Sequence, residues 1–209
     1  MAGTITALKY QKKNPHRVNV YLDGRFGFGL PDVVAARLKQ GQFLSDADIA
    51  SLQGEDAVER AYNRCLDYLG YRPRSESEVR TYLKQHEVAE EHAEAVIARL
   101  QRAGLLDDEA FARFWVENRE RFRPRGPRAL GHELRQKGID DRIIDRVLEP
   151  IDVSDSAHRS GRKKAEQLRD ADRDTFYRKL VAYLARRGFD YETAREVTDA
   201  FWNEFHAAG

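Results

Sequence analysis

The chain has 209 residues, of which 36 are Lys or Arg, 35 are Asp or Glu, and one is cysteine. A single thiol excludes an internal disulfide and a zinc-finger ligand set, and no apolar run approaches the roughly 20 residues of a membrane-spanning helix. The first residues lack the apolar core of a signal peptide, so we expect a cytoplasmic protein without membrane association. The net charge of +1 gives no overall attraction to nucleic acid.

The first 54 residues have the pattern of a small β-rich module. Apolar residues alternate in three runs, over residues 4–10, 18–22 and 26–30. Asp23-Gly24 separates the last two runs, and because glycine supplies the positive φ of a tight turn, this pattern predicts a β-hairpin. Two short helices are expected to follow, one from Pro31 to about Leu38 and one from Ser45 to Leu52.

From residue 55 onward the apolar residues recur with helical period, and the pattern repeats along the chain. Leu83, Leu134 and Leu184 are 51 and 50 residues apart. A glycine follows the second and third of these leucines by four residues, at 138 and 188, where the first unit has Glu87. The sequence Arg-Pro-Arg occurs at 72–74 and again at 123–125. The spacing therefore predicts a tandem repeat.

The predicted fold is mainly α: three tandem three-helix repeats in an elongated curved array, preceded by a small N-terminal module that contains a β-hairpin. The N-terminal module is expected to occupy residues 1–54, and the repeats residues 55–106, 107–151 and 152–209. Three short helices bury little apolar surface by themselves, so neighbouring repeats are expected to pack end to end. The alternative is three unrelated helical stretches that share loop chemistry.

Charge is segregated along the chain. Residues 113–137 carry a net charge of +5 and residues 1–31 a net charge of +4, whereas residues 87–109 carry −5. Arginines in loops between helices can bind phosphate or carboxylate groups bidentately. For any single arginine a solvated surface with intrachain salt bridges is the better interpretation, whereas the repeated Arg-Pro-Arg placement favours a functional basic face. The predicted filament- or nucleic-acid-binding residues are Arg72, Arg74, Arg119, Arg121, Arg123, Arg125, Arg128, Arg162, Lys163 and Lys164.

Signals for catalysis or metal binding are weak. His86-Glu87 resembles the start of a zinc-protease motif, but residue 90 is not the second histidine. Asp107, at the start of an acidic triplet, fits the N-cap of a helix that begins before Phe111. Cys65 lies on an apolar stripe and is expected in the core. There is no phosphate-binding glycine motif, so we expect a protein without enzymatic activity, metal or other cofactor. The aromatic residues at helical spacing are expected in the core: Phe111, Phe114, Trp115, Phe201 and Trp202.

The sequence from the first repeat into the second resembles that of the RecX family. The resemblance lies in the run from Arg72-Pro-Arg-Ser75 to Leu83, in Val96-Ile-x-x-Leu100-x-x-x-Gly104, and in Asp107-Asp108-x-x-Phe111-Ala112. It continues through Arg119, Gly126, Leu130, Glu133-Leu134, Lys137-Gly138-Ile139 and Ile143. Glu87 departs from the glycine expected at its position. The N-terminal module is similar to the extension of longer family members.

The resemblance implies tandem three-helix units that regulate the RecA recombinase in DNA repair, recombination and the SOS response. It implies binding in the groove of the RecA–DNA filament and inhibition of ATP hydrolysis and strand exchange. The implied partners are the filament and, weakly or within it, DNA, and we expect a monomer. The alternative function is a direct DNA-binding protein or transcriptional regulator. No unit has clear helix-turn-helix spacing, because the turns carry Arg and Pro.

Overall fold

The computed structural model describes residues 2–206 and divides into two compact units. The first unit runs to Arg72 and includes Val79–Leu106, and the second comprises Pro73–Glu78 and the chain from Asp107 onward. Within the described part of the chain, no helix is both long enough and apolar enough to cross a membrane.

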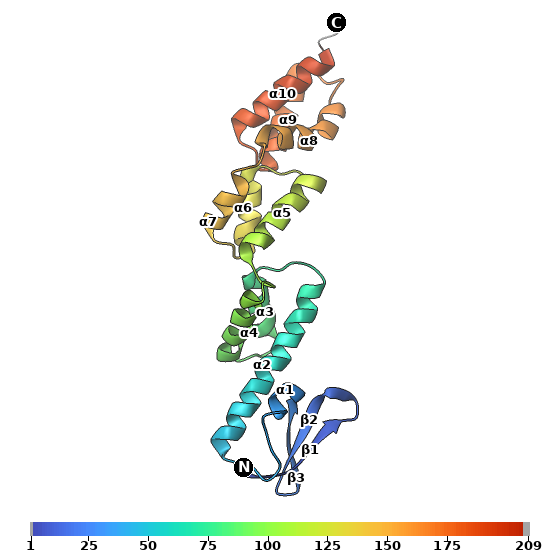
Figure 1. Ribbon diagram of the computed structural model, residues 1–209. Helices are drawn as coiled ribbons and strands as arrows, with labels where there is room; N and C mark the ends of the chain where they lie inside the picture. The colour runs from blue at the N-terminus through green and yellow to red at the C-terminus, as the bar shows by residue number, and fades with distance from the viewer. Residues whose placement is uncertain (1, 207–209) are drawn as a thin grey trace. The chain divides into compact units, whose positions relative to one another are not determined.

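A four-stranded antiparallel sheet forms the N-terminal module. Its strands are β1 (Gly3–Gln11), β2 (Asn14–Leu22), β3 (Arg25–Pro31) and β4 (Phe43–Leu44), in the order β3-β2-β1-β4 (Figure 1). The predicted hairpin between β2 and β3 is confirmed, and its two turn residues, Asp23 and Gly24, have φ of 48° and 82°. Strand β4 was not predicted, because two residues are too few to show alternation.

The helices after the sheet differ from the prediction. Helix α1 is a single turn (Asp32–Ala35), and α2 (Asp46–Gly70) runs without a break through Leu52, where the second short helix was expected to end. The capping box of Ser45 and Asp48 starts α2 as the sequence indicates. Gly54 interrupts the pattern in sequence, but a glycine inside a helix costs only about 1 kcal/mol relative to alanine. Packing of Ile49 and Leu52 against the sheet compensates for this cost.

The remaining helices form three groups of three, as predicted. The C-terminal half of α2 packs with α3 (Glu76–Gln85) and α4 (Glu90–Arg102). The second group is α5 (Asp108–Phe122), α6 (Pro127–Gln136) and α7 (Asp141–Leu148), and the third is α8 (Val153–Glu166), α9 (Arg173–Arg186) and α10 (Tyr191–His206). Each group has its own apolar core. Because α2 crosses residues 54 and 55 without a break, the boundary proposed there lies inside a helix, and the four-part division stays a prediction.

The repeat is visible in the backbone at the end of each middle helix. Leu83, Leu134 and Leu184 are all buried, and each accepts a hydrogen bond from the N–H five residues later, at 3.1–3.3 Å. The residue four positions after each leucine has positive φ: 55° at Glu87, 76° at Gly138 and 91° at Gly188. This arrangement is the Schellman motif, in which a left-handed residue ends a helix. Glu87 therefore adopts the conformation that glycine adopts in the other two repeats.

Replacing Glu87 with glycine is expected to stabilise the protein by about 1 kcal/mol, because a side chain in the left-handed region strains the backbone. Chemical denaturation followed by circular dichroism measures this change. Glu87→Ala is the matched control, since it removes the same charge but keeps Cβ, and it should give no such gain. Equal stabilisation by both variants would mean that the charge, and not the backbone, is responsible.

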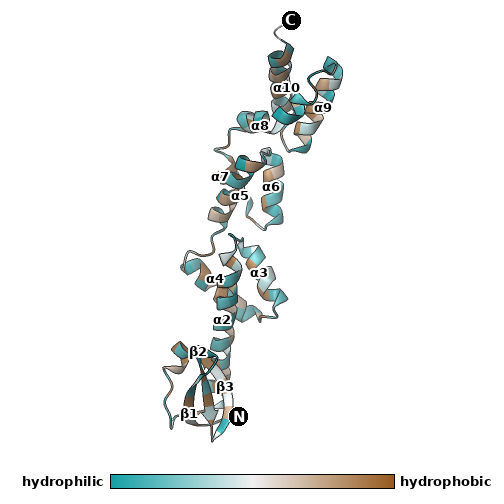
Figure 2. Cartoon of the chain, turned by 90° about the vertical axis from the view of Figure 1, so that its right-hand side faces the viewer, coloured by the Kyte–Doolittle hydropathy of each residue, from teal (hydrophilic) through white to brown (hydrophobic). Residues whose placement is uncertain are grey.

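The helices are amphipathic, with hydrophobic and hydrophilic residues on different faces (Figure 2).

The aromatic residues that were predicted in the core differ in burial. Phe111 and Phe201 are buried as predicted, while Trp115 and Trp202 are half-buried. The expectation for Phe114 was wrong, because its side chain is exposed. It lies one position before Trp115 on α5, on the side that turns away from the core that Phe111 and Val116 enter.

Candidate functional site

An ion-pair and hydrogen-bond network in the second repeat surrounds Glu133 of α6. Its Oε2 atom accepts hydrogen bonds from Trp115 Nε1 and Arg119 Nε, both at 2.8 Å, and its Oε1 atom lies 2.5 Å from Arg125 Nη1. The guanidinium of Arg119 also stacks over the Trp115 ring at 4.6 Å. The Glu133 side chain is only 12% exposed. Two of the predicted binding residues, Arg119 and Arg125, therefore hold α5 and the following loop against α6.

Three other predicted arginines of this repeat are exposed: Arg121, Arg123 and Arg128. Arg121 lies over the exposed ring of Phe122, at 5.2 Å. Arg123 is the C-cap of α5, and its backbone N–H bonds to the Arg119 carbonyl oxygen. Within residues 2–206, neither Arg123 nor Arg128 forms an ion pair. Their guanidinium groups are therefore available to an external ligand.

The other predicted basic residues lie in different surroundings. Arg72 and Arg74 are half-buried in the loop between α2 and α3. On α8, Arg162 pairs with Glu204 at 2.5 Å and stacks over Phe201 at 5.0 Å, whereas Lys163 is exposed and Lys164 half-buried. The consecutive triplet at 162–164 therefore does not present three charges on one face.

Two arginines that the sequence reasoning missed lie at the end of α9. Arg186 and Arg187, together with Arg123, Arg125 and Tyr183, line a pocket of about 370 Å³, which we call the arginine pocket. Its lining includes no carboxylate. The repeat could have indicated Arg187, because Lys137 occupies the equivalent position 50 residues earlier, at the end of the middle helix. Neither local spacing nor charge count pairs Arg187 with a loop more than 60 residues before it.

A close backbone contact positions the two halves of the arginine pocket. The N–H of Gly126 donates to the Arg187 carbonyl oxygen at 2.9 Å. A Cβ atom on Gly126 would lie 2.3 Å from the Gly188 carbonyl carbon, and one on Gly188 would lie 2.4 Å from the Ala129 Cβ. We call this contact the Gly126 joint. Only glycine at both positions allows the backbones to approach so closely.

The same joint recurs one repeat earlier within the second unit, with a different donor. Ser75, 51 residues before Gly126, uses its side chain, so that Ser75 Oγ donates to the Lys137 carbonyl oxygen at 2.7 Å. Ser75 also forms the predicted capping box with Glu78. Lys137 Nζ pairs with Glu78 at 2.9 Å, so the charge equivalent to Arg187 is neutralised there.

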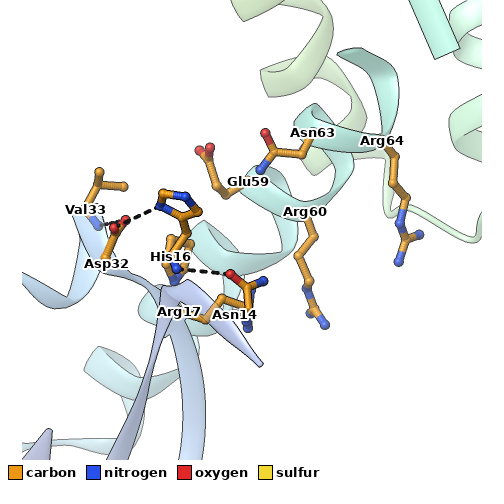
Figure 3. A pocket seen from close by; sticks show the side chains of 10 residues that line it. Asn14, His16, Arg17, Asp32, Val33, Glu59, Arg60, Asn63 and Arg64 are labelled. Atoms are coloured by element: carbon orange, nitrogen blue, oxygen red, sulfur yellow. Dashed lines mark hydrogen bonds and ion pairs between the residues drawn. The ribbon is translucent and has the colours of Figure 1, made fainter. Parts of the chain in front are cut away.

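A second, larger pocket of about 730 Å³ lies between the sheet and α2. Figure 3 shows its side chains, with Asp32 and Glu59 among the basic residues. His16 Nδ1 lies 3.5 Å from Asp32, and Arg17 pairs with the buried Asp56 at 2.8 Å. Because carboxylates and cations are mixed in it, this pocket does not select an anion.

The acidic residues at the start of α5 and the single cysteine have roles in the fold. Asp107 caps α5, as predicted, by accepting the N–H groups of Glu109 and Ala110. Asp108 accepts the N–H of Glu76 at 2.8 Å, and its burial raises its pKa above the ordinary value. Burial also raises the pKa of the Cys65 thiol to about 11, which disfavours the reactive thiolate. Within the described residues, no group of three or more His, Cys, Asp or Glu could hold a metal ion.

Comparison with known protein families gives matches along most of the chain. The RecX N-terminal domain matches residues 3–45, and the first, second and third three-helix domains of RecX match residues 61–100, 107–148 and 152–198.

Curated relatives and solved structures that are similar to this chain also carry the name RecX. A curated relative from Bacillus subtilis (strain 168), named regulatory protein RecX, is 35% identical over 201 residues, which cover 93% of this chain and 76% of the relative. A RecX from Listeria monocytogenes is 28% identical, with 98% and 78% covered. A crystal structure of regulatory protein RecX superposes with a TM-score of 0.82 at 30% identity, covering 94% of this chain and 99% of the other. A RecX structure from Lactobacillus salivarius, at 23% identity and a TM-score of 0.65, shares the fold over 70% of this chain and 97% of its own.

Proposed function

Because the chain belongs to the RecX family of regulatory proteins, we propose that it regulates the RecA recombinase by binding the RecA–DNA filament. In this proposal it inhibits ATP hydrolysis and strand exchange and has no enzymatic activity of its own. Its place of action is the cytoplasm, in DNA repair and recombination.

One observation carries this proposal beyond the family name. Three exposed arginines lie at and beside the loop between α5 and α6: Arg121 in the last turn of α5, Arg123 in the loop, and Arg128 in the first turn of α6. Arg123 and Arg128 have no ion-pair partner within residues 2–206. A nucleoprotein filament offers DNA phosphate and protein carboxylates together, and guanidinium groups bind both bidentately. We assign filament contact to these residues and to Lys163. Arg119, Arg125 and Arg162 have intrachain partners and serve mainly to hold the fold.

Titration of the unmodified protein into RecA-dependent ATP hydrolysis and strand exchange tests this proposal. Both activities are expected to fall, because the bound protein occupies the filament groove or prevents filament growth. Inhibition far below one protein per recombinase would favour capping of filament ends, and inhibition only near saturation would favour groove occupancy. If saturating protein changes neither activity, the proposal is wrong.

Binding to naked DNA separates the proposal from the alternative of a direct DNA-binding regulator. A filament regulator should bind the assembled filament more tightly than the same DNA without recombinase. Equal affinity for the two, measured at one salt concentration since phosphate binding depends strongly on salt, would favour the alternative.

A further inference from the structure

The arginine pocket combines positive charge with few internal partners. Of its four arginines, Arg125 is paired with Glu133, while Arg123, Arg186 and Arg187 form no ion pair within the described part of the chain. The Nε atom of Arg125 is buried and has no hydrogen-bond partner. Guanidinium groups repel one another, and an unpaired buried donor costs free energy. An anion in the pocket relieves the repulsion between the guanidinium groups.

The pocket is also built before any ligand arrives. Arg187 Nη2 donates to the Tyr183 hydroxyl at 2.7 Å, and the guanidinium lies over the Tyr183 ring at 5.0 Å. The Gly126 joint fixes the α5–α6 loop against the end of α9. Little side-chain or backbone freedom is therefore lost on binding at Arg125 and Arg187, which favours affinity.

We propose that the arginine pocket binds one phosphate group of the DNA backbone, with Arg123 and Arg186 as the main contacts and Arg187 as a pre-oriented third. A phosphate has tetrahedral oxygens that donors can approach from several sides, and this suits arginines from two separate elements. A carboxylate has only two oxygens, both in one plane, so it offers donors fewer directions of approach than a phosphate does. The inference deepens the proposed function, because the phosphate would belong to DNA in the filament, but it can be tested without recombinase.

The test is binding of a fluorescent single-stranded oligonucleotide to the full chain at low salt, followed by anisotropy. The double variant Arg123→Ala/Arg186→Ala is compared with Arg178→Ala/Lys179→Ala. The control removes two exposed charges from α9 that do not line the pocket. We expect the pocket variant to lose on the order of tenfold in affinity, since charge-assisted hydrogen bonds are lost. The magnitude of its log–log salt slope should fall by about 0.7 for each phosphate contact removed. The control should change little.

Two outcomes would overturn the phosphate site, and the second is divided further by filament binding. Equal losses in both variants would show a general effect of net charge. Unchanged DNA binding in the pocket variant would exclude phosphate contact. Unchanged DNA binding with weakened filament binding would mean that the pocket contacts recombinase carboxylates, and the proposed function would survive without this inference. Because Arg123 and Arg186 are exposed and unpaired in the described chain, both variants should remain folded, and circular dichroism verifies this. In Arg123→Lys/Arg186→Lys, which keeps the charge, part of the affinity should return.

Discussion

Gly188→Ala is expected to destabilise the second unit by about 3 kcal/mol or more. Two costs combine at this residue. Its φ of 91° is unfavourable for any side chain. The new Cβ would also lie 2.4 Å from the Ala129 Cβ and 2.5 Å from the Ala129 backbone nitrogen, so the Gly126 joint would have to open. Chemical denaturation measures the loss, and hydrogen exchange at Gly126 N–H reports whether the joint has opened.

Gly104→Ala is the matched control for this prediction. Gly104 also follows the end of a helix with positive φ, 67°, but a Cβ there would meet nothing within 4 Å. It should therefore cost only about 1 kcal/mol, the backbone part alone. A loss at Gly188 no larger than that at Gly104 would show that the close approach in the Gly126 joint does not contribute.

Glu133→Ala is expected to cost about 3 kcal/mol, since it leaves Arg119, Arg125 and the Trp115 indole N–H without their shared acceptor. Glu133→Gln retains one acceptor oxygen without the charge, so it should cost less. Denaturation gives the free energy of unfolding, and tryptophan fluorescence reports changes around Trp115.

Glu117→Ala serves as the control for this change, because Glu117 is an exposed carboxylate on α5 without an ion-pair partner within residues 2–206. Exposed substitutions of this kind usually stay within about ±0.5 kcal/mol. If Glu133→Ala were as mild as Glu117→Ala, Arg119 and Arg125 would be free to contact the filament, and their assignment to the fold would be wrong.

Local patterns in the sequence predicted much of the fold. The Asp23-Gly24 turn is a short-range signal, and the spacing of Leu83, Leu134 and Leu184 records one repeated helix end. The continuity of α2 escaped prediction because the local pattern up to Leu52 does not show that Ile49 and Leu52 pack against the sheet module, which offsets the cost of Gly54 inside the helix.

The candidate site was only partly predictable, for the same physical reason. Composition located the arginines of the α5–α6 loop, but it could not show which of them Glu133 holds. The arginine pocket needs residues from two repeats, Arg123 and Arg186, which a backbone contact brings together. Charge counts along a sequence do not contain that contact.

Helix α2 has a mechanical consequence for the first unit. Its N-terminal part enters the core of the sheet module through Ile49 and Leu52, and its C-terminal part enters the core of the first repeat through Ala61 and Cys65. A helix of 25 residues is about 37 Å long. Because the helix is continuous and packs into both cores, it connects them rigidly and not as a flexible linker. The sheet module therefore cannot rotate freely about the first repeat. A torque applied to the sheet by a bound partner would be transmitted directly to that repeat. A truncation at residue 54 would interrupt helix α2 in its interior and would not release an intact domain.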